Sequence, residues 1–140
     1  MNDIERQLAA EMALMIAMHE AYTPGMVDTA GRRIIEVLDP EGHVRVFCDS
    51  DMWIARMGRN AFDAPDMTDR PTLGALEGQI GDRVGAHVST RLVTVTLSDD
   101  PVEQYVCGPI VRGNVLADGR GDTHGEAVAR AWLAMFGDTR

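Results

Sequence analysis

The sequence predicts an α+β fold with antiparallel β-hairpins packed against helices: an α-β-β-α sandwich-like core with an N-terminal helix and hairpin. Two observations favour it. Residues 86–97 and 103–112 are rich in the β-branched types that suit strands, and the turn residues Ser98-Asp99-Asp100-Pro101 lie between them. Apolar residues recur at helical spacing in three other stretches. A chain of 140 residues buries a sizeable core, so we expect one domain over residues 1–140.

The first helix is predicted over residues 3–22. The stripe expected to be buried recurs at steps of three and four: Ile4, Leu8, Met12, Met15 and His19. The helix should end at Thr23-Pro24-Gly25, because the residue before a proline avoids helical backbone angles.

A first β-hairpin is predicted from residues 32–38 and 43–48, which flank the turn residues Asp39-Pro40-Glu41-Gly42. The residues expected on its buried face are Ile35, Val37, Val44 and Val46. Asp49-Ser50-Asp51 is typical of a helix N-cap, so a short helix is predicted over residues 52–57.

Residues 59–70 show no regular period and are expected to form a long loop. A helix should follow from residue 69 or 70, with Pro71 in its first turn, where the missing N–H costs nothing. Its buried stripe should consist of Leu73, Leu76 and Ile80. Gly74 and Gly78 weaken this helix, and close approach of a neighbouring sheet would explain them.

The chain closes with a predicted short strand at residues 115–117, a loop at residues 118–122 and a helix. Thr123 and Glu126 have the spacing of a capping box, which satisfies backbone N–H groups at a helix start. The apolar stripe of this helix is Val128, Ala131, Trp132 and Met135.

The composition is acidic. The formal net charge is −9, which disfavours direct nucleic-acid binding because neutralising phosphates supplies most of that affinity. All thirteen cationic residues are arginine, which excludes Schiff-base chemistry and the phosphate-binding loop that ends in Gly-Lys-Ser/Thr. The charge suits either a basic partner or simple solubility.

The cysteines Cys48 and Cys107 lie in apolar strand-like runs, where a free thiol behaves as a small hydrophobe. The sequence shows no secretory pattern and no stretch of membrane-spanning length. We therefore expect free thiols, no membrane association and a cytoplasmic location in a bacterial host.

No catalytic motif is evident, so we expect no catalytic, cofactor-binding or metal-binding residues and no cofactor. His43 and His87 open predicted strands, but neither has an acidic partner at metal-ligand spacing. One alternative is a small enzyme or ligand-binding domain with a site near Cys107 and His87 on adjacent strands.

Acidic residues gather in the predicted loop and at the turn of the second hairpin. The candidate partner-binding residues are Asp63, Asp66, Asp69, Asp99, Asp100 and Glu103. Carboxylates that converge in space would present spaced negative charge to a basic surface. A solvated charged surface without a partner is the alternative.

Two segments carry a family resemblance: residues 65–76 (PDMTDRPTLGAL) and residues 125–133 (GEAVARAWL). They resemble the bracketing helices of small α-β-β-α sandwich proteins encoded by bacteriophages and prophages, whose individual functions are mostly unassigned. The resemblance implies a viral accessory protein and carries over no functional residue.

These observations lead to a functional hypothesis. We expect a non-enzymatic phage or prophage accessory protein that binds a host protein or complex with a basic surface. It would act as an acidic inhibitor of a nucleic-acid-binding defence complex, as anti-CRISPR proteins do. A structural homodimer built through the methionine-bearing face of the first helix is a further alternative.

Overall fold

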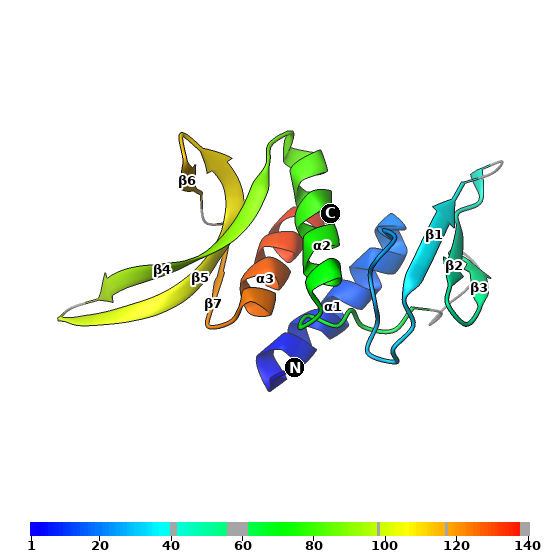
Figure 1. The fold of residues 1–140 in the computed structure, drawn as a ribbon, viewed down its shortest axis with the longest axis horizontal. Coiled ribbons are helices and arrows are strands. Elements are labelled where there is room, and N and C mark those ends of the chain that lie inside the picture. The colour runs from blue at the N-terminus through cyan, green and yellow to red at the C-terminus, as the bar shows by residue number, and fades with distance from the viewer. Residues whose placement is uncertain (40–41, 56–61, 98, 117, 138–140) are drawn as a thin grey trace. The chain divides into compact units, whose positions relative to one another are not determined.

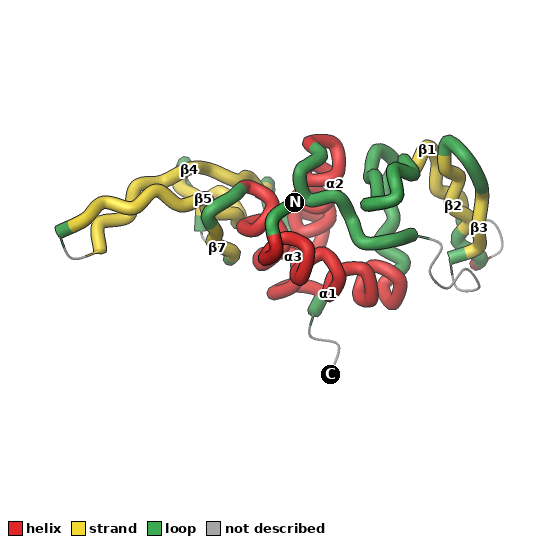
Figure 2. The backbone as a smooth tube through the Cα atoms, turned by 90° about the horizontal axis from the view of Figure 1, so that it is seen from below, coloured by secondary structure: helices red, strands yellow, loops and turns green. Residues whose placement is uncertain are grey.

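The computed structural model describes residues 1–39, 42–55, 62–97, 99–116 and 118–137 (Figure 1). The helices are α1 (Asp3–His19), α2 (Arg70–Val84) and α3 (His124–Phe136). The strands are β1 (Ile34–Leu38), β2 (Arg45–Cys48), β3 (Met52–Ile54), β4 (Val88–Leu97), β5 (Asp100–Val111), β6 (Asn114–Val115) and β7 (Gly119–Gly121). They form two antiparallel sheets, which confirms the predicted α+β class with its N-terminal helix and hairpin (Figure 2).

The chain divides into two compact units, Met1–Ala75 and Leu76–Arg140, and the boundary falls within α2. Each unit has its own sheet and its own buried residues. They are described separately below as unit 1 and unit 2.

In unit 1, α1 begins with a capping box in which Asn2 and Glu5 exchange hydrogen bonds at 2.8 Å. The predicted stripe is partly wrong: Met12 is buried as expected, but Ile4 is 44% exposed. The buried stripe is Glu5, Ala9, Met12 and Ile16. Glu5 is buried because its carboxylate satisfies the N–H at the helix start.

The sheet of unit 1 has the order β1-β2-β3, and the predicted hairpin of β1 and β2 is confirmed. The prediction that Ile35 is buried is wrong, because the register shifts between Ile34 and Glu36. Ile34 therefore points into the core at 1% exposure, while Ile35 is 61% exposed. Residues 40–41 of the predicted turn lie outside the described residues.

The predicted helix at residues 52–57 is wrong. Residues 52–54 form β3, which pairs with β2, and Trp53 lies opposite the buried Val46. The N–H of Cys48 donates to the carbonyl of Asp51 at 2.7 Å, so the residues predicted as a helix cap form a strand-to-strand turn. Residues 56–57 lie outside the described residues.

The segment before α2 is well buried where the structure describes it, since Phe62, Pro65 and Met67 are all in the core. Helix α2 then begins at Arg70 with Pro71 in its first turn, as predicted. Its predicted stripe, Leu73, Leu76 and Ile80, is buried. The explanation predicted for Gly74 and Gly78 is wrong, because both are exposed and a Cβ at either position would meet no atom within 4 Å.

In unit 2, β4 and β5 form an antiparallel ladder, and β5 pairs in addition with β6 and β7. The loop predicted at residues 118–122 is wrong, because Gly119–Gly121 is a strand. A Cβ on Gly119 would lie 2.3 Å from backbone atoms of Ala127 and Ala131, so this glycine permits direct backbone contact between β7 and α3. Of the strand predicted at residues 115–117, only Val115 lies in a strand, β6, and residue 117 lies outside the described residues.

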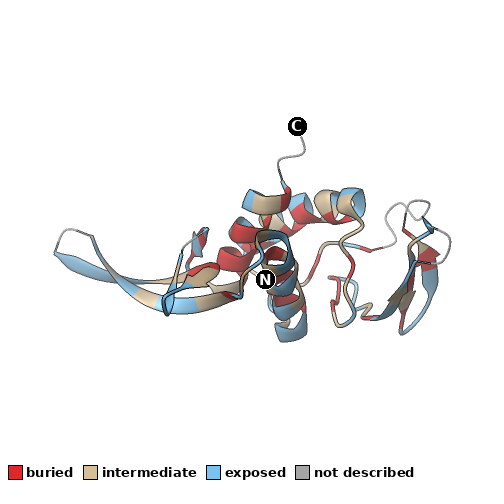
Figure 3. Cartoon of the chain, turned by 90° about the horizontal axis from the view of Figure 1, so that it is seen from above, coloured by how far each residue is buried: buried red, intermediate tan, exposed pale blue. Residues whose placement is uncertain are grey.

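Helix α3 provides much of the buried surface of unit 2. The predicted N-cap Thr123 is confirmed, because its hydroxyl accepts a hydrogen bond from the N–H of Glu126 at 3.1 Å. The Glu126 carboxylate accepts the N–H of Asp122 at 3.1 Å, one residue before the N–H that a capping box uses. Val128, Ala131 and Trp132 are fully buried, and the indole N–H of Trp132 donates to Gln79 at 2.9 Å. Figure 3 shows the buried residues of α3 in red beside the base of the β4–β5 hairpin.

Candidate interaction surface

The distal part of the β4–β5 hairpin, residues 91–97 and 99–105, is largely exposed, and we call it the arm. The ladder runs through ten positions without a shift, from Val88 opposite Pro109 to Leu97 opposite Asp100. Strand β7 pairs with β5 at Tyr105–Cys107, which is where the arm begins. Beyond that point the two strands continue without a third (Figure 1).

Apolar side chains are exposed along the arm. Leu92 is 51% exposed and Val102 is 40% exposed. Thr94 and Thr96 are exposed as well, whereas Val106 and Cys107 at the base are buried (Figure 3). A two-stranded hairpin without other packing is only marginally stable.

The end of the arm carries three of the six candidate residues. Asp99, Asp100 and Glu103 are all exposed, and Glu103 lies opposite Thr94 in the ladder. Within the part of the chain that the structure describes, none of the three forms an ion pair. All three lie within five positions of the chain at the end of the arm, with Asp100 and Glu103 on opposite faces of β5, and we call them the acidic tip.

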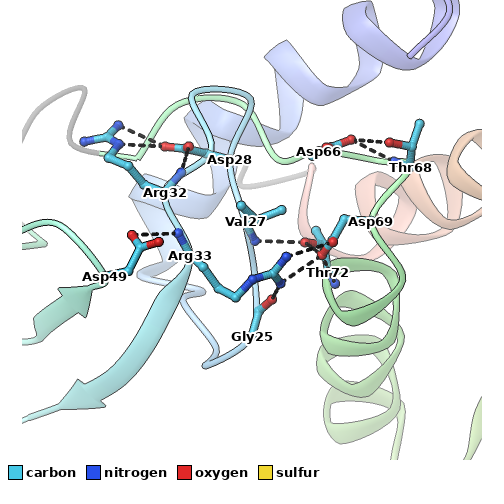
Figure 4. A network of polar contacts seen from close by, with 10 residues as sticks. All are labelled: Gly25, Val27, Asp28, Arg32, Arg33, Asp49, Asp66, Thr68, Asp69 and Thr72. Atoms are coloured by element: carbon cyan, nitrogen blue, oxygen red, sulfur yellow. Dashed lines mark hydrogen bonds and ion pairs between the residues drawn. The ribbon is translucent and has the colours of Figure 1, made fainter.

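The other three candidate residues, Asp63, Asp66 and Asp69, lie in unit 1 on the segment before α2, and Figure 4 shows Asp66 and Asp69. Asp63 is exposed, and its carboxylate accepts a hydrogen bond from the N–H of Ala64. Asp66 accepts two hydrogen bonds from Thr68, at 3.0 Å from the backbone N–H and 2.6 Å from the hydroxyl. These contacts form a local turn on the surface of unit 1.

Asp69 has a structural role. It accepts hydrogen bonds from both Nη atoms of Arg33, and from the N–H and hydroxyl of Thr72 in the first turn of α2. The hydrogen bonds from Arg33 lower the pKa of Asp69 below its ordinary value. A carboxylate with these partners has little capacity left for another protein.

A buried carboxylate in unit 1 escaped the sequence analysis. The Asp28 side chain is fully buried and accepts hydrogen bonds from the N–H groups of Ala30, Arg32 and Asp63. The Arg32 guanidinium pairs with it at 2.9 Å and lies 5.7 Å from the centre of the Trp53 ring. An Asp followed by Thr29-Ala30-Gly31 is a turn signal that pointed to this role.

The alternative site near Cys107 and His87 does not form a pair. Cys107 is fully buried opposite Thr90, and burial raises the pKa of its thiol to about 11. His87 is exposed three residues further along, and its carbonyl accepts the N–H of Ile110 at 2.9 Å. The thiol therefore stays protonated at neutral pH and has no imidazole beside it.

A polar group does lie at the base of the hairpin. The hydroxyl of Thr90 donates to Glu77 Oε2 at 2.9 Å, and His124 Nε2 lies 3.7 Å from Glu77 Oε1. The ring of Tyr105 stacks on His124 with centroids 6.0 Å apart. These contacts connect α2, β4, β5 and the start of α3, and so fix the base from which the arm extends.

No group of three or more metal-ligating side chains occurs among the described residues. Cys48 and Cys107 are both free and buried. None of the described helices combines the length and apolar character needed to cross a bilayer. Comparisons with protein-family models, with curated proteins and with solved structures find no match to this chain.

Proposed function

We propose that this chain is a protein-binding module that presents the acidic tip to a basic surface of another protein. The observation that carries the proposal is the exposure of Asp99, Asp100 and Glu103, without ion-pair partners among the described residues, at the end of the arm. Three carboxylates on a narrow arm attract a basic groove and disfavour an acidic one.

The magnitudes assign different roles to the charged and apolar groups of the arm. An exposed ion pair contributes about 0.2–1 kcal/mol, so the acidic tip mainly sets the association rate and the choice of partner. Burial of apolar surface contributes about 25 cal/mol per Å², and the arm exposes Leu92 on one face and Val102 on the other. A partner that binds one face of the arm should therefore have an apolar group beside its basic surface.

The family resemblance of the two helical segments supports a specific form of this proposal. In it, the protein is a phage or prophage accessory protein and the basic surface belongs to a host nucleic-acid-binding complex. The carboxylates of the acidic tip then occupy sites that otherwise hold phosphates, and the protein inhibits by competition without a chemical step.

The proposal is tested with a tip variant and a control of equal charge. The tip variant is Asp99→Asn, Asp100→Asn and Glu103→Gln. The control variant is Glu11→Gln, Glu36→Gln and Asp82→Asn, at exposed positions on α1, β1 and α2. Each set removes three negative charges and changes the formal net charge from −9 to −6, since −9 + 3 = −6.

Affinity purification from a bacterial host should recover a partner with the wild-type chain and the control but not with the tip variant. Binding to that purified partner should weaken as salt rises, because exposed charges are screened within about 10 Å at 0.1 M. Recovery of the same proteins by the tip variant, or equal loss with both variants, would contradict the proposal.

A further inference from the structure

The outer edge of β4 is a row of backbone groups whose direction follows from the ladder. Ile110 N–H donates to the carbonyl of His87 at 2.9 Å, so His87 directs its carbonyl toward β5. Backbone groups of successive residues alternate in direction along a strand, and this register has no shift. Every second residue of β4 therefore points its N–H and C=O away from β5: Val88, Thr90, Leu92, Thr94 and Thr96.

Hydrogen bonds on the side of β5 that faces away from β4 support this assignment. The carbonyls of Pro109 and Cys107 accept hydrogen bonds from Leu116 and Asp118, on the side of β5 opposite β4. Pro109 and Cys107 lie opposite Val88 and Thr90 in the ladder. Residues that face each other across an antiparallel ladder point either both inward or both outward, so Val88 and Thr90 also point outward.

This outer edge is open over most of its length. Strand β4 is the end strand of its sheet, and no backbone hydrogen bond to its outward groups occurs within the described residues. Val88 is buried near Gly81 of α2, whereas Thr90 is partly exposed and Leu92, Thr94 and Thr96 are exposed. Four consecutive outward positions are enough for a further strand to pair.

The open edge lacks the features that prevent the sheet edges of monomeric proteins from pairing with one another. Edge strands are commonly protected by lysine, proline, inward-pointing charge or a bulge. Arg91 is the only charged residue of β4, the strand has no proline, and its register is unbroken. Residues 92–97 (LVTVTL) are uncharged and rich in β-branched types.

We propose that two copies of this chain pair along the outer edges of β4, antiparallel and centred on Val93, so that one sheet continues across the dimer. The four accessible outward residues are symmetric about Val93, so they match their own counterparts. Thr90 of one copy lies opposite Thr96 of the second, and Leu92 lies opposite Thr94 of the second. All outward backbone groups between residues 90 and 96 are then satisfied.

The charge distribution selects the antiparallel orientation and a second copy as the occupant. The hairpin carries Arg91 and Arg112 toward its base, and Asp99, Asp100 and Glu103 at its far end. Antiparallel pairing places the two acidic tips at opposite ends, whereas parallel pairing would bring six carboxylates together. The paired segment is uncharged between residues 92 and 96, and so it suits an identical strand better than a basic one.

The dimer goes beyond the proposed function and does not compete with it. The acidic tip begins at Asp99, past the last paired residue, Thr96. Each dimer therefore presents two tips, which would raise the apparent affinity for a partner with two basic sites.

The first test removes one outward N–H. In Thr94→Pro the missing N–H is one that β5 does not use, and proline is tolerated on a strand edge that faces solvent, so the hairpin itself is kept. Thr94→Ala is the matched control. Light scattering over a roughly thousandfold range of concentration should show dimers for the wild type and Thr94→Ala. Thr94→Pro should raise the dimer dissociation constant at least about tenfold.

The second test locates the two-fold axis of the proposed dimer. Val93 would face Val93 of the second copy as a non-hydrogen-bonded pair, with Cα atoms about 4.5 Å apart, within the range that a disulfide spans. Val93→Cys should therefore form a disulfide-linked dimer in air. Thr94→Cys would face Leu92, with its counterpart too far along the strand for a disulfide. The native thiols are buried in both variants and do not compete.

Disulfide-linked dimer from Val93→Cys but not from Thr94→Cys, together with loss of dimer in Thr94→Pro, supports the proposal. A wild-type chain that stays monomeric at every concentration overturns it. So do a dimer that Thr94→Pro leaves intact, and equal crosslinking of the two cysteine variants. These outcomes are separate from those of the tip variant, whose mutated residues lie outside the paired segment.

Discussion

Arg33 and Asp69, 36 residues apart in sequence, form a two-point contact in unit 1. Arg33 Nη1 donates to Asp69 Oδ2 at 3.1 Å, and Nη2 donates to Oδ1 at 3.0 Å. Asp69 Oδ2 also accepts the hydroxyl of Thr72 at 2.8 Å, and that hydroxyl oxygen accepts the N–H of Val27 at 2.9 Å. This series of hydrogen bonds, from Val27 through Thr72 and Asp69 to Arg33, connects the segment before β1 to the first turn of α2 (Figure 4).

Thr72→Val should destabilise unit 1 by about 1–3 kcal/mol, because it removes the only buried hydroxyl in this chain of contacts and leaves the buried N–H of Val27 without an acceptor. The measurement is the free energy of unfolding in urea. The matched control is Thr68→Val, since the hydroxyl of Thr68 also donates to an aspartate but is exposed. The control should change stability by less than about 0.5 kcal/mol. Equal effects of the two changes would contradict the role assigned to Thr72.

The pKa of Asp69 predicts a pH dependence of stability. Hydrogen bonds from Arg33 lower the folded-state pKa below the unfolded value, so the carboxylate stabilises the fold above the unfolded pKa of about 4. This contribution is lost as the pH falls from the unfolded pKa through the lower folded pKa. Asp69→Asn should therefore cost about 1–2 kcal/mol at pH 7 and progressively less below about pH 4. Urea unfolding of both proteins between pH 7 and 3 tests this, and a constant difference would contradict it.

Local sequence patterns predicted which segments form helices and hairpins more reliably than they predicted which side of each is buried. Period and capping residues identified all three helices and both hairpins, because these signals act within a few residues. The buried face of the first hairpin depended on a register shift between Ile34 and Glu36, which no sequence spacing indicates. Strand β3 was assigned to a helix because Asp49-Ser50-Asp51 suits a helix cap and a turn equally well.

For two pairs of glycines, the sequence analysis predicted the opposite of the role that the structure shows. Gly119 and Gly121 were predicted to lie in a loop, but Gly119 allows β7 to contact the backbone of α3, and Gly121 lies against the side chain of Glu126. Gly74 and Gly78 looked like packing residues, but they are exposed. In both cases a distant segment decides the role of the glycine, so only the three-dimensional arrangement reveals it.

The candidate acidic residues also divide by tertiary context. Asp99, Asp100 and Glu103 lie at the end of one hairpin because they are close in sequence, and their role in binding stays a prediction. The sequence analysis assigned Asp69 to the binding of another protein, because Arg33, the residue that contacts it within this chain, is 36 residues away. The open edge of β4 was not predicted at all, since strand order is a property of the whole sheet.

Alanine substitutions at glycines should have opposite signs in α2 and β7. Gly78→Ala, on an exposed helical position with open space around it, should stabilise the protein by about 0.5–1 kcal/mol. Gly119→Ala should destabilise it by about 3 kcal/mol or more, because the new Cβ would overlap the backbone of α3. The two changes alter the unfolded chain in the same way, so the difference reports the folded structure. Thermal or urea unfolding measures it, and effects of equal sign would show that β7 does not lie against α3 as described.

The two thiols should be unreactive in the folded protein. Burial raises the pKa of both Cys48 and Cys107 to about 11, so at pH 7 each has about a hundredfold less thiolate than an ordinary cysteine. Because the thiolate is the nucleophile, labelling with a disulfide reagent at pH 7 should be slower by at least that factor, and exclusion of the reagent adds to it. Unfolding in guanidinium should restore the ordinary rate for both residues, which provides the internal control. Rapid labelling of Cys107 in the folded protein would indicate that β5 opens from α3, and would return the site near His87 to consideration as a reactive centre.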